Sequence, residues 1–225
     1  GFWGSVSSVF NRQYLIKKAL IDINFQVKPG EMVGLIGANG AGKTTLVKIL
    51  SGIIHCPEGS IRVMETDPWK RNPQYLKHMS LVMGQKAQLW WDLPALDSYL
   101  LLKEIYQIPQ ARYQKNLEEL TETLNVGAVL STPVRKLSLG ERMKVELVAA
   151  LLHSPQVVYL DEPTIGLDIM AQKAIRAFLK DYQSRNKTTI LLTSHYMKDI
   201  EELCPRIALM KEGQIIFGGP IENLQ

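Results

Sequence analysis

A glycine-rich stretch, GANGAGKT at positions 37–44, carries the residues with the clearest chemical meaning. It matches the pattern G-x-x-x-x-G-K-[ST] of phosphate-binding loops, and it lies between a predicted strand and a predicted helix, as that motif requires. Its glycines let the backbone approach an anion closely, and its exposed amides face the phosphates. Lys43 supplies a cation for the β- and γ-phosphates, and Thr44 supplies a hydroxyl for Mg²⁺. The predicted nucleotide-binding residues are Gly37, Ala38, Asn39, Gly40, Ala41, Gly42, Lys43, Thr44 and Thr45.

Two adjacent acids follow an apolar run in VVYLDEP, residues 157–163. The run predicts a buried strand that places Asp161 and Glu162 at its end, where an unpaired carboxylate is costly. Asp161 is predicted to hold Mg²⁺, and Glu162 to orient or polarise an attacking water. A surface turn that happens to contain acids would explain neither the apolar approach nor the upstream loop.

The elements around these motifs alternate between strands and helices, which predicts an α/β fold with a mostly parallel sheet. Strands are expected at 20–27, 32–37, 80–83, 157–160, 188–193, 206–210 and 213–217. The first of these alternates between apolar and polar residues and predicts a half-buried antiparallel strand. Helical spacing dominates from about 87 to 153. We therefore expect one domain over 1–225, with a core formed by about 1–86 and 154–225 and a helical insertion over about 87–153.

Composition narrows the class of protein. The chain has 225 residues, a net charge of +4 and basic residues that are scattered rather than clustered, which gives no support to a nucleic-acid partner. The two cysteines, Cys56 and Cys204, lack metal-ligand spacing and are interpreted as reduced thiols. No apolar run approaches the roughly 18 residues of a membrane span, and no signal peptide opens the chain. We expect a soluble intracellular protein.

With these two motifs placed, the chain resembles the ATPase domain of ABC transporters, from Tyr14 to about Gly219. The resemblance implies a P-loop NTPase core with an N-terminal antiparallel β subdomain and an inserted α-helical subdomain. It also implies ATP and Mg²⁺ as ligands. By the same resemblance, Gln85 in VMGQ would reach Mg²⁺ and water, Asp168 in GLD would bridge two monomers, and His195 in LTSH would hydrogen-bond the γ-phosphate.

The family signature, LSGGQ, has a modified counterpart in LSLGE, which comprises Leu137, Ser138, Leu139, Gly140 and Glu141. In the family, the signature binds the ATP of the opposite monomer. Leu139 and Glu141 are the departures from the family pattern. Ser138 and Glu141 also have the spacing of a helix capping box, so an ordinary capped helix is the alternative interpretation.

Tyr14 is the first candidate for the aromatic residue that stacks on adenine. Phe10 is the second candidate, and core packing is the alternative for both. Trp90 and Trp91 follow the Gln85 segment, where ABC ATPases dock onto their permease; they would line that groove or lie buried in the helical core.

The stretch SLVMGQKAQLWWDLPALDSYLLLKEIY resembles ATPases of the ABC-2 exporter type. The resemblance implies a homodimer that forms with ATP and drives a separate transmembrane permease from the cytoplasmic face of the membrane. Two other functions remain open: an ABC ATPase that acts on nucleic acid or ribosomes, and a nucleotide-binding regulatory module without hydrolysis.

Overall fold

The structure, a computed structural model, describes residues 18–84 and 86–224. Its centre is one six-stranded sheet in the order β2-β3-β4-β1-β5-β6, in which only β6 runs antiparallel to its neighbour. The strands are β1 (Met32–Gly37), β2 (Met79–Met83), β3 (Val157–Asp161), β4 (Thr189–Thr193), β5 (Arg206–Lys211) and β6 (Gln214–Pro220). The prediction of an α/β fold with a mostly parallel sheet is confirmed.

Helices cover both faces of the sheet, and β1 shows this directly. Met32 and Ile36 pack into one hydrophobic cluster, whereas Val33 and Leu35 pack into another. A strand that is covered on both faces has no polar side, which is why β1 reads as a continuous apolar run. The helices are α2 (Lys43–Leu50), α3 (Pro73–His78), α4 (Ala95–Ile105), α5 (Gln110–Thr123), α6 (Leu139–Leu151), α7 (Ile169–Asn186) and α8 (Met197–Leu203).

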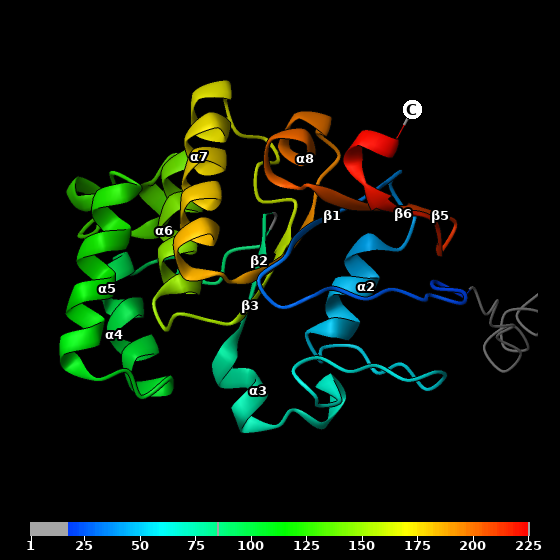
Figure 1. Cartoon of the computed structure of the whole chain (residues 1–225). Coiled ribbons are helices and arrows are strands. Elements are labelled where there is room, and N and C mark those ends of the chain that lie inside the picture. Colours follow the sequence, from blue (N-terminus) through cyan, green and yellow to red (C-terminus); the bar gives the residue numbers. More distant parts are fainter. Residues whose placement is uncertain (1–17, 85, 225) are drawn as a thin grey trace, which may run out of the picture.

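The predicted helical insertion corresponds to α4, α5 and α6. Figure 1 shows these three green helices grouped at one side of the molecule, beyond the β2 end of the sheet. α6 packs on both α4 and α5 and also contacts β2, so it joins the helical group to the sheet. In the part of the chain that the structure describes, no helix is both long enough and apolar enough to cross a bilayer.

The predicted strand over 20–27 is wrong. The segment alternates in burial as expected, with Ile23, Phe25 and Val27 half-buried and their neighbours exposed, but it belongs to no ladder. A strand needs a partner whose backbone groups face its own, and residues 18–84 and 86–224 offer none along this segment. One main-chain bond, from Ile21 N to Gly213 O at 2.8 Å, holds its start. Asp22 next to it has a φ of 46°, which interrupts an extended strand.

The junction between the helical group and the sheet contains a buried histidine. The His153 ring stacks on Tyr106 with centroids 3.8 Å apart, and its Nε2 donates to the Met79 carbonyl at 3.1 Å. Burial lowers the pKa of His153 to about 4. Because the unfolded chain takes up this proton at a higher pH than the folded chain, the stability that depends on neutral His153 is present at neutral pH. It declines as the pH falls from about 6.5 towards 4.

We expect His153→Phe to reduce the pH dependence of stability. Phenylalanine retains the stacking on Tyr106 and cannot titrate, although the Met79 carbonyl loses its donor. From about pH 7 to about pH 5, wild type should lose about 2 kcal/mol more unfolding free energy than the variant. Urea denaturation of both proteins at the two pH values measures this difference. The other titrating groups are the same in both proteins, so their contributions to the pH dependence cancel when the two are compared. Equal losses would contradict the buried neutral state.

Candidate functional site

The phosphate-loop motif connects β1 to α2, and its backbone carbonyls bind the side chain of the motif's lysine. Gly40 and Gly42 have φ values of 81° and 105°, a conformation that favours glycine. Lys43 is buried, and its Nζ donates to the carbonyls of Gly37 at 2.6 Å and Ala38 at 3.1 Å. The lysine ammonium therefore lies inside the loop, beside the N-terminus of α2, where an anion is favoured.

Helix α2 and strands β3 and β4 bring a hydroxyl, a carboxylate and a second hydroxyl together beside this loop. Thr44 Oγ1 donates to Asp161, at 2.9 Å from Oδ2 and 3.1 Å from Oδ1. Thr193 Oγ1 donates to Asp161 Oδ1 at 2.6 Å. Asp161 and Thr193 are paired residues at the ends of β3 and β4. This set of hard oxygen ligands fits Mg²⁺, with Thr44 and Asp161 as the protein groups that would hold it.

Glu162 and His195 lie next to each other beyond the same strand ends. His195 Nδ1 is 3.1 Å from Glu162 Oε2, and the His195 side chain is more exposed, at 39% against 17% for Glu162. The Glu162 backbone has a φ of 54°, an uncommon value for a residue with a Cβ, and its amide donates to Thr193 O at 3.0 Å. Such backbone strain collects at functional sites and needs surrounding contacts to hold it.

Residues of the phosphate loop, together with Glu162, line a cavity of about 690 Å³. Its lining residues are Lys18, Ala19, Ile21, Asn39, Gly40, Gly42, Lys43, Thr44, Thr45, Glu162, Glu212 and Gly213. Five of these residues match no sequence motif and were not predicted: Lys18, Ala19, Ile21, Glu212 and Gly213. The bond between Ile21 and Gly213 brings two segments from opposite ends of the chain to the mouth of the cavity, and no local pattern signals that contact.

The predicted signature residues lie at the start of α6. Ser138 caps the helix: its amide donates to Glu141 Oε2 at 2.9 Å, and its Oγ accepts from the Glu141 amide at 3.3 Å. Hydrogen bonds from the Ser138 hydroxyl and amide lower the pKa of Glu141. Leu139 is 38% exposed. Leu137 precedes the cap, and a Cβ added to Gly140 would stand 3.0 Å from Ala171 Cβ on α7.

None of the five signature residues lines the cavity at the phosphate loop, so one chain does not bring the two motifs together. Asp168 is the N-cap of α7 and accepts from the Ala171 amide at 2.9 Å. The start of α6 therefore packs on the start of α7, next to the GLD motif.

Tyr14, Phe10 and Gln85 lie outside the described residues. The segment after Gln85 is attached to α6, because Glu146 Oε1 accepts from the Gln88 amide at 2.9 Å. Trp90 and Trp91, which follow it, are 49% and 47% exposed, which excludes burial in the helical core. With Asp92 and Leu93 they line a shallow hollow of about 280 Å³.

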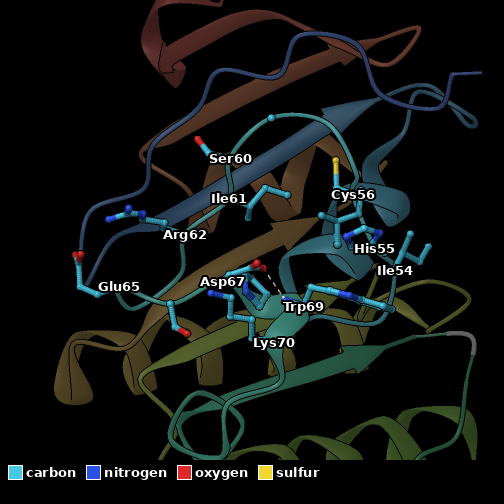
Figure 2. Close-up of a pocket in the computed structure, with 14 residues that line it drawn as sticks. Ile54, His55, Cys56, Ser60, Ile61, Arg62, Glu65, Asp67, Trp69 and Lys70 are labelled. Carbon is cyan, nitrogen blue, oxygen red and sulfur yellow. Dashed lines mark hydrogen bonds between the residues drawn. The ribbon is translucent and has the colours of Figure 1, made fainter.

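A separate hollow of about 440 Å³ lies between the loop after α2 and the short 3₁₀ helix η1 (Pro68–Lys70). Figure 2 shows His55 and Cys56 on the loop and Trp69 on η1; the rings of His55 and Trp69 are 4.8 Å apart. Asp67 uses its carboxylate to accept from the Trp69 amide at 2.9 Å. None of the phosphate-loop residues lines this hollow, so it is distinct from the cavity at Lys43. Both cysteines are free thiols, as expected.

A family model, curated relatives and solved structures all match this chain to ATP-binding proteins of ABC transporters. The family model described as ABC transporter matches residues 20–165. The chain is 28% identical to the ABC transporter ATP-binding protein NatA of Bacillus subtilis, over 96% of this chain and 87% of that protein. It is 33% identical to Nod factor export ATP-binding protein I of Burkholderia pseudomallei, over 92% and 68% of the two chains. Its fold matches the structure of cbiO1 from Clostridium perfringens, part of the ABC transporter complex cbiONQ, with a TM-score of 0.81, 26% identity and coverage of 92% and 83%.

Proposed function

Because this chain belongs to the ABC transporter family as an ATP-binding and ATP-hydrolysing subunit, we propose that ATP is bound and cleaved at the cavity beside the phosphate loop. The single observation that carries this proposal is the meeting of two pairs at adjacent strand ends. Thr44 contacts Asp161, and Glu162 contacts His195. Ligands of open α/β sheets bind at the carboxyl ends of the strands, and these pairs lie there.

Each residue has a role that its position supports. Lys43 turns from the loop carbonyls to the β- and γ-phosphates, and the loop amides face the same anions. Thr44 and Asp161 would hold Mg²⁺, which would neutralise phosphate charge when bound. Glu162 orients and deprotonates the attacking water, while His195 donates to the γ-phosphate and is held by Glu162. Gln85 remains assigned to Mg²⁺ and water, and Tyr14 to adenine, by resemblance alone.

The separation of the two motifs within one chain supports a dimeric arrangement. The signature at the start of α6 lies outside the cavity of its own chain, which leaves it available to a nucleotide held by a second copy. We propose that two copies enclose two ATP molecules head to tail. Each copy then contributes its phosphate loop to one nucleotide, and Ser138, Gly140 and the N-terminus of α6 to the other. Asp168 is proposed to lie at the contact between the copies.

The partner that we propose is a separate transmembrane permease. The name of the Nod factor export relative and the membership of cbiO1 in a transporter complex support this assignment. The exposed group of Trp90, Trp91 and Leu93 presents apolar surface on the segment attached to α6, and exposed apolar surface of this kind favours a protein contact. We propose that this group faces the permease at the cytoplasmic side of the membrane, in an ABC-2-type exporter.

Lys43→Ala should abolish most of the stabilisation that ATP gives. With ATP at a hundred times its dissociation constant, wild type should gain about 2.7 kcal/mol of unfolding free energy. The variant loses the cation that faces two phosphates, so the same ATP concentration should raise its melting temperature far less. Thermal shift with and without MgATP measures the difference, and Lys48→Ala on α2 is the matched control. Equal ATP-induced shifts in wild type and Lys43→Ala would refute the assigned role.

A further inference from the structure

The two residues proposed for catalysis lie on different loops. Glu162 follows β3, and His195 follows β4 with Ser194 between. The pairing of β3 with β4 ends at Asp161 and Thr193, and one further backbone bond, from Glu162 N to Thr193 O at 3.0 Å, ties Glu162 to β4. The ladder does not extend to His195. The 3.1 Å contact between Glu162 and His195 therefore also depends on how the two loops are held beyond the ladder.

A single buried carboxylate supplies contacts to both loops. Asp199, near the start of α8, is completely buried, with a relative exposure of 0%. One of its oxygens, Oδ2, accepts from the hydroxyls of Thr164 and Ser194, the latter at 2.9 Å. Thr164 comes two residues after Glu162, and Ser194 comes directly before His195. One oxygen atom thus binds the side-chain hydroxyls of two residues, one near each of the residues proposed for catalysis.

The remaining contacts hold this carboxylate in place. Its Oδ1 accepts from Arg176 Nη1 on α7 at 2.9 Å, and Arg176 Nε donates to Glu202 at 2.8 Å. Arg176 is itself only 3% exposed. The Ser194 hydroxyl also accepts from the Tyr196 amide at 3.0 Å, so its orientation is set on both sides of His195. A buried charge whose hydrogen bonds are all made is rigid, because every displacement leaves a partner unsatisfied.

We propose that Asp199 is a positioning residue that sets the spacing of Glu162 and His195 by holding Thr164 and Ser194 on one carboxylate oxygen. The proposal rests on the proposed function of the Glu162–His195 pair. Asp199 does not line the cavity at the phosphate loop, so it acts through the two loops. Because a misplacement of about 1 Å can cost a hundredfold in rate, loss of either hydroxyl should act on turnover rather than on nucleotide affinity.

The test compares Thr164→Val with Thr164→Ser. Valine keeps the shape of threonine and removes the hydroxyl, whereas serine keeps the hydroxyl. We expect Thr164→Val to lower kcat for MgATP by roughly tenfold to a hundredfold, with an unchanged dissociation constant for ATP. Thr164→Ser retains the hydrogen bond to Asp199 and should keep kcat close to that of wild type. Ser194→Ala is the second variant, and it keeps the proposal testable if Thr164→Val does not fold.

The matched control is Thr121→Val in α5, which removes another buried hydroxyl far from the strand ends, one that donates to Leu117 O at 2.7 Å. Its kcat should equal that of wild type. If Thr164→Val and Ser194→Ala lower only the melting temperature, with kcat per folded protein like that of Thr121→Val, the positioning role is overturned. Glu162→Gln separates this failure from failure of the proposed function: if Glu162→Gln still hydrolyses ATP normally, the catalytic assignment itself is wrong.

Discussion

Steady-state phosphate release by Glu162→Gln should fall at least about a hundredfold below wild type, because general-base catalysis contributes typically 10²–10⁴-fold. The Glu162 carboxylate lies beside His195 at the mouth of the cavity, where an attacking water would approach a bound γ-phosphate. Glutamine keeps the size of the side chain and loses the base. Lys43, Thr44 and Asp161 are untouched, so ATP should still bind, and the ATP-bound dimer should accumulate.

Size-exclusion chromatography of Glu162→Gln with MgATP should therefore show a dimer that is absent without nucleotide. Glu201→Gln is the matched control, since Glu201 is an exposed acid on α8 and should leave turnover unchanged. A Glu162→Gln protein that releases phosphate at the wild-type rate would remove Glu162 from the mechanism. A protein that stays monomeric at high concentration in saturating MgATP would count against the dimer.

Gly140→Asp should also abolish turnover, while ATP binding by the isolated chain stays intact. In the proposed dimer, Gly140 faces the nucleotide of the second copy, and aspartate adds both bulk and negative charge next to the phosphates. We expect turnover at least about a hundredfold below wild type, the scale of loss found when a charge-stabilising contact is removed. Phosphate release and equilibrium ATP binding, measured in parallel, separate a defect between copies from a defect in the chain's own site.

The controls for this prediction come from the same stretch. Gly140→Ala introduces the Cβ that would stand 3.0 Å from Ala171, so it measures the cost of that contact without the charge. Leu139→Gly and Glu141→Gln should each change turnover by less than about tenfold, or 1.4 kcal/mol. Normal hydrolysis by Gly140→Asp would reduce the signature to an ordinary capped helix.

The structure supports a small effect at these two positions. A Cδ2 atom of Leu139 lies 3.2 Å from where a Cβ on Gly166 would stand, so this side chain is directed at the GLD loop. Glu141 folds back onto the amide and hydroxyl of Ser138, at 2.9 Å and 2.7 Å. The Leu139 and Glu141 side chains are therefore both held within their own chain, and the helix cap is complete without glutamine.

The sequence predicts an element best where a continuous run of apolar residues shows that both faces of the element are buried. The run at 32–37 is apolar throughout and forms β1 with those bounds. The segment 20–27 has an equally clear pattern and forms no strand, because the pattern reports which side chains are buried and not whether a pairing partner exists. Two short helices, α3 and α8, were not expected, since six or seven residues are too few for a helical period to show.

The residues of the candidate site likewise fall into those that local sequence indicates and those that only the fold brings together. Lys43, Thr44, Asp161 and Glu162 belong to short motifs, so the chain order alone indicates them. Asp199 belongs to no recognisable motif, although it is fully buried and bonds Thr164 near Glu162 and Ser194 next to His195. Its partners lie up to 35 residues away along the chain, and only the folded sheet brings them together.

The central claim is that each ATP lies between two copies of the chain, and mixing two inactive variants tests it most directly. Lys43→Ala damages the phosphate loop, and Gly140→Asp damages the signature. In an equimolar mixture, half of the randomly formed dimers contain one of each, and one of their two sites pairs an intact phosphate loop with an intact signature. We predict that the mixture regains roughly a quarter of the wild-type rate of phosphate release, at an ATP concentration where each variant alone is inactive. A mixture no more active than the sum of its two components would contradict the shared site.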